Sequence, residues 1–599
     1  MSILERFPLS SEPYTHQKNV LLTLEEALRS GDEGSNKFLI LRAPTGTGKS
    51  AVAITLAQEV RARGGSVHLL ASHKFLQTQY HTDFSSLGLK LLWGKGNYDC
   101  NNALELNKFF KQGRLISCAQ CLADKAEDRT SYIRENCTDS EYFGDKCLYI
   151  RAKEEAKLSS LTLNNYNSFL AHTAYAGTFA GRDLLIVDEA HLLSQRLADF
   201  ITTKFTVSNY FTQSTLDSIP TSSNAADFTP WLEDFLLADV EDEFLDWAIE
   251  VNPSYNDIEA AEIGAKELED SDSLISGNLG YEPHRTDVPP LRFVKLNRLR
   301  SRIHKLINML TTSPDNWVCY KIYKDDRETK LDYLEFKPVV VGKLAHKYLF
   351  DYGALVLLLS ATMDSGPFLR DLGISANEVR VFLDVPSVFP LEARPLLADF
   401  CGKMSANHRE KTLPKVAEKA ASIIKTYHPT EKGIIHTHSF KNCRDLKKLL
   451  PKDIQDRIIW HLDGTTNIND LTQTFFNSAT KWLASPSCTE GLDGKGDRVR
   501  AQIIIKAPFP SLGDPQVIAR KNKQDGYTWY CLAAVNKIVQ AYGRGTRNKE
   551  DYSVTYVLDS AVANLVTKTR KHLPEWFTTA WNKASLSNWD WDGSRWRLR

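Results

Sequence analysis

Short runs of consecutive apolar residues, separated by stretches with helical spacing, form the main pattern of this chain. A parallel strand that is buried on both faces has such a run instead of an alternation of apolar and polar residues. The early runs end at about residue 360 and the late ones begin after about residue 430, so the alternation predicts an α/β fold with two domains. The seven runs are Phe38–Leu41, Val67–Leu70, Leu184–Val187, Val356–Leu359, Ile434–His436, Ile503–Lys506 and Val554–Leu558.

Two segments interrupt this rhythm and look like insertions into the first α/β domain. Residues 98–150 contain five of the ten cysteines, and residues 200–340 lack clear buried strands and look mostly helical. Within the second segment, Arg292–Leu310 is basic, with apolar residues near helical spacing. The C-terminal tryptophans are expected to pack against the second α/β domain, with base stacking as the alternative. They are Trp581, Trp589, Trp591 and Trp596.

The glycine-rich segment Ala43–Ser50 lies between the run Phe38–Leu41 and a helix-like stretch that begins at Ala51. A strand, a tight glycine loop and a helix N-terminus together place backbone N–H groups around an anion. Lys49 would then reach the β- and γ-phosphates of a nucleotide, and Ser50 would bind Mg²⁺. An ordinary glycine-rich turn is the alternative.

Paired acids follow the run Leu184–Val187 at Asp188 and Glu189. The carboxyl end of a buried strand is where an α/β sheet places catalytic groups. Asp188 would hold Mg²⁺ through water and Glu189 would polarise the attacking water. Capping of the next helix is the alternative for such a pair.

An arginine pair, Arg544 and Arg547, follows Gln540 in the late half of the chain. Residues three apart share a face of a helix, and such a pair can neutralise charge that develops on the γ-phosphate. The alternative is a surface arginine pair.

The charge balance and the cysteines restrict which surfaces and which cellular compartment we expect for this protein. The 599 residues hold 74 Lys and Arg against 74 Asp and Glu, so a nucleic-acid surface has to be local. The sequence contains no run of about 18 apolar residues, so we expect no membrane span. Met1–Leu9 does not read as a signal peptide, so we expect reduced thiols and a cytoplasmic or nuclear location.

Five cysteines lie close together, and the spacing of Cys118 and Cys121 suits two thiolates on one metal ion or cluster. Zinc and an iron–sulfur cluster are both chemically possible, and buried free thiols are the alternative. The five are Cys100, Cys118, Cys121, Cys137 and Cys147.

Several blocks resemble known helicase motifs. Asp188-Glu189-Ala190-His191 after a phosphate loop resembles superfamily 2 helicases, as do Ser360-Ala361-Thr362, Glu490–Asp493 and Gln540–Arg547. The flanks of the cysteine block, Gly94–Cys100 and Cys147–Lys153, resemble the boundaries of the iron–sulfur domain in the XPD/DinG family. Asn164-Asn165-Tyr166-Asn167 resembles the family segment before the DEAH strand. The resemblance extends from Tyr14 to Asp559 and is weakest over 200–340.

The resemblance implies two RecA-like parallel-sheet domains with a cysteine-rich iron–sulfur insertion and a mainly helical Arch-like insertion. The implied boundaries are 1–97, 151–199 and 341–385 for the first helicase domain, 98–150 for the cluster, 200–340 for the Arch and 386–599 for the second helicase domain.

The resemblance also assigns residues to ligands. It implies catalytic roles for Lys49, Asp188, Glu189, Gln540, Arg544 and Arg547. Nucleotide contacts would come from Tyr14, Gln17, Thr45, Gly46, Thr47, Gly48, Lys49, Ser50 and Asp493, and Mg²⁺ contacts from Ser50 and Asp188. The [4Fe–4S] ligands would be Cys100, Cys118, Cys121 and Cys147, with Cys137 able to replace Cys147. Candidate strand contacts are His73, Lys74, Gln77 and the basic segment Arg292–Lys305.

The expected function is therefore an ATP-dependent DNA helicase that acts as a monomer on single-stranded and forked DNA, away from membranes. By resemblance it moves 5′ to 3′, in repair or replication. A DEAH-type RNA helicase and a nucleic-acid-binding scaffold with a degenerate ATPase are the alternatives.

Overall fold

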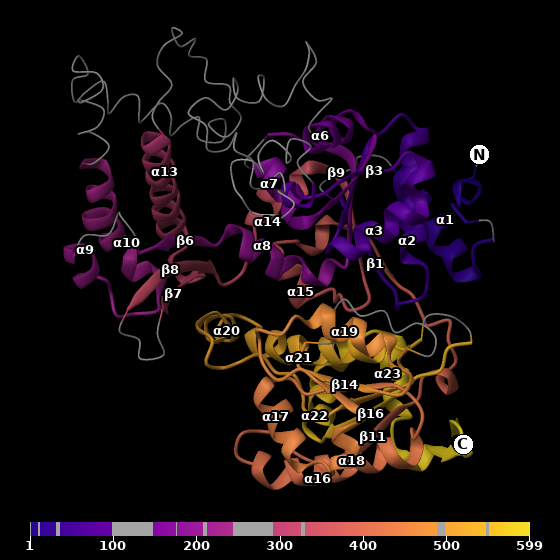
Figure 1. Ribbon diagram of the computed structural model, residues 1–599. Helices are drawn as coiled ribbons and strands as arrows, with labels where there is room; N and C mark the ends of the chain where they lie inside the picture. The colour runs from indigo at the N-terminus through magenta and orange to yellow at the C-terminus, as the bar shows by residue number, and fades with distance from the viewer. Residues whose placement is uncertain are drawn as a thin grey trace, which may run out of the picture.

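The first domain is built on a sheet of seven strands that are all parallel, in the order β10-β1-β9-β5-β2-β4-β3 (Figure 1). The computed structural model describes residues 2–9, 12–30, 36–98, 148–174, 177–207, 213–242, 291–324, 330–487, 498–546 and 550–599. The strands are β1 (Phe38–Arg42), β2 (Val67–Ala71), β3 (Lys90–Leu92), β4 (Leu161–Asn165), β5 (Arg182–Asp188), β9 (Gly353–Ser360) and β10 (Val379–Asp384).

Helices cover both faces of this sheet because successive side chains of a strand point to opposite faces. In β1, Phe38 and Ile40 enter one apolar core, and Leu39 and Leu41 enter the other. All five residues of β1 are buried, as expected of a central parallel strand. The helices are α1 (Thr15–Arg29), α2 (Lys49–Ala62), α3 (Lys74–Phe84), α6 (Leu148–Leu158), α7 (Tyr166–Ala174), α8 (Leu193–Ile201), α14 (Leu344–Tyr348) and α15 (Pro367–Asp371).

The second domain repeats this plan with six parallel strands in the order β11-β16-β15-β12-β14-β13. Its strands are β11 (Leu396–Gly402), β12 (Gly433–His436), β13 (Ile458–Trp460), β14 (Trp482–Ser485), β15 (Ala501–Ile504) and β16 (Val554–Asp559). Its helices are α16 (Arg409–Ser422), α17 (Phe440–Leu449), α18 (Lys452–Gln455), α19 (Ile468–Asn477), α20 (Pro515–Lys521), α21 (Gly526–Tyr542), α22 (Ala561–Thr569) and α23 (Glu575–Asn582).

All seven apolar runs overlap strands of these two sheets, and the α/β fold is confirmed. The run Ile503–Lys506 overlaps its strand only in part, because β15 covers Ala501–Ile504 and the chain has left the sheet at Lys506. Six further strands lack a distinctive apolar run: β3, β4, β10, β11, β13 and β14.

The segment 200–340 contains an antiparallel sheet that its sequence pattern does not reveal. Strands β6 (Thr203–Thr206), β8 (Leu331–Pro338) and β7 (Trp317–Tyr323) pair in that order. Buried residues in β8 alternate with partly exposed ones towards its end, so no continuous apolar run marks it. The described helices are α9 (Gln213–Asp217), α10 (Thr229–Trp231) and α13 (Leu291–Thr312).

Helix α13 confirms the helical spacing predicted for the basic segment. Ile303, Leu306 and Leu310 have no exposed surface and belong to the apolar core that continues into the first sheet domain.

The C-terminal tryptophans pack as expected. Strands β17 (Trp589–Trp591) and β18 (Trp596–Leu598) form a hairpin, and Trp589 and Trp596 are buried in a core of the second domain. The indole N–H of Trp596 donates to the Tyr556 hydroxyl at 2.8 Å.

Direct contacts join the two sheet domains and the insertion. Arg520 of α20 pairs with Asp371 of α15 at 2.5 Å, and both side chains are buried. The insertion reaches the same helix, since the Tyr320 hydroxyl donates to Asp514 at 2.5 Å and the Gln516 amide to the Pro338 carbonyl at 2.6 Å. Within the described ranges, every helix is too short or too polar to cross a membrane.

Candidate active site

The glycine loop after β1 adopts the shape expected of a phosphate cradle. Gly46 and Gly48 have φ angles of 79° and 78°, in the left-handed region that favours glycine. A Cβ atom on Gly48 would lie 2.2 Å from the Gln17 side-chain nitrogen. Gln17 braces the loop, because its amide donates to the Thr47 carbonyl at 3.1 Å while its oxygen accepts from the Tyr14 N–H at 2.8 Å.

Helix α2 starts at Lys49, so its first backbone N–H groups face the loop. Nine of its fourteen residues are buried, which fixes this N-terminus on the sheet. The Lys49 ammonium donates to the Ala43 and Pro44 carbonyls at 3.1 and 3.2 Å. It therefore lies within the loop that would surround the phosphates.

Asp188 ends β5 and is buried, with both carboxylate oxygens hydrogen-bonded. Its Oδ1 accepts from the Glu189 N–H and its Oδ2 from the Tyr80 hydroxyl, each at 2.8 Å. Burial and the neighbouring Glu189 charge raise the pKa of Asp188 to about 6, against the opposing effects of Lys49 and Tyr80. A bound cation would favour the ionised form of this carboxyl.

Glu189 has a φ angle of 56°, unusual for a residue with a side chain and typical of functional turns. Burial favours its neutral form, but the hydrogen bond and charge of His191, with Lys49 and Arg544, hold the pKa of Glu189 well below its usual range. His191 Nδ1 lies 3.2 Å from the Glu189 carboxylate and 2.9 Å from the Ser360 hydroxyl at the end of β9. Glu189 is thus an ionised group of the kind that can orient water.

The second domain reaches this site through α21 and the turn after it. The Gln540 amide donates to the Thr362 hydroxyl at 3.2 Å, and the Thr45 hydroxyl donates to the Gly543 carbonyl. The prediction that Arg544 lies on a helix is wrong: α21 ends at Tyr542. Two glycines break the helix here, and Gly545 passes so close to Ser553 that a Cβ would lie 2.0 Å from its hydroxyl.

Residues from both domains line one cavity of about 450 Å³. The first domain contributes Lys49, Ser50, Asp188 and Glu189, and the second contributes Gln540 and Arg544. Thr45, Gly46 and Gly48 also line the cavity. Carboxylates of the first domain and cations of both domains therefore converge on a space large enough for a nucleotide.

Ser50 and Asp188 are suitable ligands for Mg²⁺, which prefers oxygen. Both side chains interact with the Tyr80 hydroxyl, so the two oxygen donors lie close together.

Several predicted residues lie outside the described residues: Arg547, Asp493, Cys100, Cys118, Cys121, Cys137 and Cys147. Within the described ranges, no group of three or more His, Cys, Asp or Glu side chains could hold a metal ion. The cluster assignment thus stays a prediction.

The candidate strand contacts in the first domain differ in exposure. Gln77 is fully buried, donates to the Leu92 carbonyl at 3.4 Å and accepts from the Asn165 amide at 3.2 Å, so its prediction as a strand contact is wrong. Lys74 and Phe75 are exposed at the start of α3.

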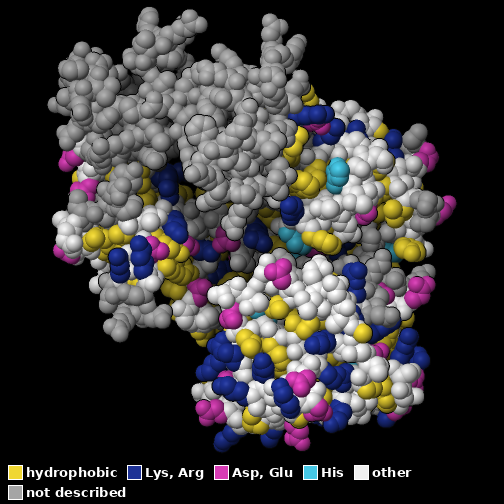
Figure 2. Space-filling view, viewed as in Figure 1, with side chains coloured by type: hydrophobic (Ala, Val, Ile, Leu, Met, Phe, Trp, Pro, Cys, Tyr) yellow, Lys and Arg dark blue, Asp and Glu magenta, His cyan; other side chains and the backbone are white. Residues whose placement is uncertain are grey.

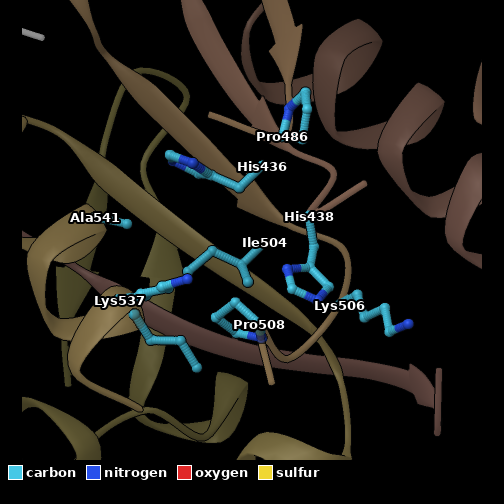
Figure 3. Close-up of a pocket in the computed structure, with 9 residues that line it drawn as sticks. His436, His438, Pro486, Ile504, Lys506, Pro508, Lys537 and Ala541 are labelled. Atoms are coloured by element: carbon cyan, nitrogen blue, oxygen red, sulfur yellow. The ribbon is translucent and has the colours of Figure 1, made fainter. Parts of the chain in front are cut away.

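A smaller cavity of about 40 Å³ in the second domain adds residues that the sequence analysis missed (Figure 3). His436 and His438 come from the end of β12, Lys506 follows β15, and Lys537 lies on α21. Burial and the two lysines lower the pKa of His438 to about 4. The sequence signal was His-Thr-His, which begins at the last residue of the predicted strand Ile434–His436, where an α/β sheet presents its ligand-binding edge.

Two family models match the chain. The one described as "Helicase C-terminal domain" matches residues 423–580, and "Type III restriction enzyme, res subunit" matches residues 10–216. The ATP-dependent DNA helicase YoaA of Escherichia coli (strain K12) is 23% identical over 92% of this chain and 91% of its own length.

Other relatives match over short segments. The regulator of telomere elongation helicase 1 homolog of Drosophila melanogaster is 36% identical over 12% of this chain, and that of Caenorhabditis elegans is 29% identical over 18%. These matches span only 8% and 11% of the two relatives.

The fold is similar to a solved structure titled "XPD_Helicase", with a TM-score of 0.55 and 13% identity over 94% of this chain and 98% of that one. The matched helicase domains, the full-length likeness to YoaA and the XPD-like fold together support an XPD/DinG-like superfamily 2 helicase.

Proposed function

We propose that this protein hydrolyses ATP to move along single-stranded DNA and thereby separates the strands of duplex and forked DNA. The observation that carries the proposal is the shared cavity, in which Lys49, Asp188 and Glu189 of one domain face Arg544 of the other. A nucleotide in that cavity would contact both domains at once. Its hydrolysis would then change how the domains are held together.

The chain's own residues suit each part of phosphoryl transfer. Lys49 and the N-terminus of α2 would neutralise the phosphates, and Ser50 and Asp188 would hold Mg²⁺, which supplies charge at the β- and γ-oxygens. Glu189 would orient the attacking water, while Arg544 would stabilise charge that develops on the γ-phosphate. Tyr14, a residue that is 53% exposed beside the loop, would contact an adenine base.

Three regions with positively charged side chains would receive the DNA strand. They are the start of α3 with Lys74 beside His73, the second-domain cavity with Lys506 and Lys537 beside the neutral His438, and the exposed Arg302 and Lys305 on α13. Figure 2 shows a hollow where the insertion and the two sheet domains meet, with Lys and Arg side chains near its margin. Phosphate contacts of this kind bind a strand without regard to sequence.

Polarity, cofactor and setting are proposed from the family resemblance. The direction is 5′ to 3′, and the clustered cysteines hold a [4Fe–4S] cluster in a domain that parts the duplex. The protein acts as a monomer in the cytoplasm or nucleus. Because YoaA is named as a DNA helicase, we favour DNA over RNA as the substrate.

Replacing Lys49 should separate ATP hydrolysis from strand binding. We expect Lys49→Ala to lower strand-stimulated phosphate release by about 10²-fold or more, because the phosphates lose their principal charge partner. Binding of single-stranded DNA, measured by fluorescence anisotropy, should persist. Lys37→Ala is the matched control, since Lys37 precedes β1 at its other end and bonds to the Phe350 carbonyl. Full hydrolysis by Lys49→Ala would refute the site.

Tailed duplexes test substrate and direction together. With ATP, we expect unwinding of 5′-tailed and forked DNA but not of 3′-tailed DNA. ATP turnover should also rise more with single-stranded DNA than with RNA of the same sequence. Preference for the 3′ tail would reverse the assigned polarity, and a larger response to RNA would favour an RNA helicase.

Metal analysis tests the cysteine cluster. The purified protein should contain iron and sulfide, and Cys118→Ser should lose both together with unwinding while keeping part of its ATPase activity. Colourless wild-type protein with zinc and without iron or sulfide would end the cluster assignment. A normal unwinding rate in Cys118→Ser would contradict the role of this domain in strand separation.

A further inference from the structure

Helix α3 connects the two sites on which the proposed function depends. Its first turn carries the exposed Lys74 and Phe75, beside the candidate strand contact His73. The nucleotide cavity borders this turn, because His73 and Phe75 line it together with Leu76, Gln79 and Asp83 further along the helix. A ligand at either place therefore meets the same rigid element.

A single hydroxyl links this helix to the catalytic carboxylate. Tyr80 lies on α3, is 1% exposed and donates to Asp188 Oδ2 at 2.8 Å. The other carboxylate oxygen is held by the N–H of Glu189, the next residue in the chain. One of the two hydrogen bonds is therefore local and fixed, whereas the other depends on where α3 lies.

Few side chains of α3 are buried against the rest of the first domain. Only Gln77, Tyr80 and Phe84 are buried along its eleven residues, compared with nine of fourteen in α2. Gln77 is the only other polar member of this buried face, and it bonds to the Leu92 carbonyl and Asn165. A helix held by so few buried side chains can shift at a smaller cost than its neighbour.

The distance from the first turn of α3 to Tyr80 is short enough for rigid transmission. Lys74 and Tyr80 are six residues apart, which corresponds to about 9 Å of helix axis. A hydrogen bond weakens steeply when its length or angle departs from the optimum. A small shift at the first turn would thus alter how firmly Asp188 is oriented.

We propose that Tyr80 is the positioning residue through which strand binding at α3 is communicated to Asp188 in the ATP site. The proposal rests on the proposed function, because it requires that a strand bind near His73 and Lys74. Thermodynamic linkage makes the effect reciprocal. If a bound strand orients Asp188 and so raises the affinity for Mg²⁺-nucleotide, then bound nucleotide raises the affinity for the strand by the same factor.

The test measures this coupling without catalysis. The affinity of the full-length protein for a dye-labelled oligodeoxythymidylate is measured by anisotropy, first alone and then with saturating Mg²⁺ and the non-hydrolysable analogue AMP-PNP. In the wild type we expect the affinity to change by about 5-fold or more, within the usual range of allosteric coupling. In Tyr80→Phe, the nucleotide should change the strand affinity by less than about 2-fold, while the affinity without nucleotide stays as in the wild type.

Tyr166→Phe is the matched control. Tyr166 is also 1% exposed, and its hydroxyl donates to the backbone carbonyl of Asp188 instead of its carboxylate. Both variants thus lose a buried hydroxyl beside the same residue, and Tyr166→Phe should keep the wild-type coupling. Thermal melting shows whether both variants are folded.

The outcomes separate the two proposals. Wild-type coupling in Tyr80→Phe, or an equal loss of coupling in both variants, would overturn the role of Tyr80 while leaving the helicase assignment intact. A wild-type protein whose strand affinity ignores the nucleotide, and whose ATP turnover ignores the strand, would overturn the proposed function as well.

Discussion

The convergence of charge between two parallel sheets is the constraint on which the rest of this molecule depends. Asp188 and Glu189 lie at the carboxyl end of a buried strand and line the same cavity as Lys49 of the phosphate loop. Arg544 adds a second positive charge from the other domain. A triphosphate with Mg²⁺ would join this arrangement, so nucleotide binding and domain closure become one event.

Polar contacts connect the nucleotide cavity to other parts of both domains. His191 connects Glu189 to Ser360, and Thr362, two residues further on, accepts from Gln540 of the second domain. Farther from the cavity, the buried pair of Arg520 and Asp371 holds the same two domains together. Removing one partner of such a pair leaves a buried charge uncompensated, so this contact restricts the relative positions that the domains can adopt.

The sequence predicted the parts of the fold that depend on local pattern. Buried parallel strands show as apolar runs, and the glycine loop and the acid pair follow two of them directly. Features with weaker local signals were not predicted. Strand β8 was missed because its buried residues alternate with partly exposed ones. Gln77 was predicted to be a strand contact, although its side chain is hydrogen-bonded to the Leu92 carbonyl and to Asn165. The end of α21 before Arg544 lies beside the close approach of Gly545 to Ser553, a backbone contact that the pattern of apolar and polar residues does not show. Tyr80 was missed because its partner Asp188 is 108 residues away in the sequence.

The most direct measurement is single-turnover ATP hydrolysis by Arg544→Ala with saturating single-stranded DNA, beside binding of a fluorescent ATP analogue to the same variant. If both domains serve one nucleotide, binding should stay within about threefold of the wild type while hydrolysis falls by about 10³-fold or more, as for other arginines that stabilise phosphoryl transfer. Arg570→Ala, an exposed arginine of the second domain that bonds to Asn582, should hydrolyse ATP normally. Wild-type hydrolysis by Arg544→Ala would contradict the shared site and the motor built on it.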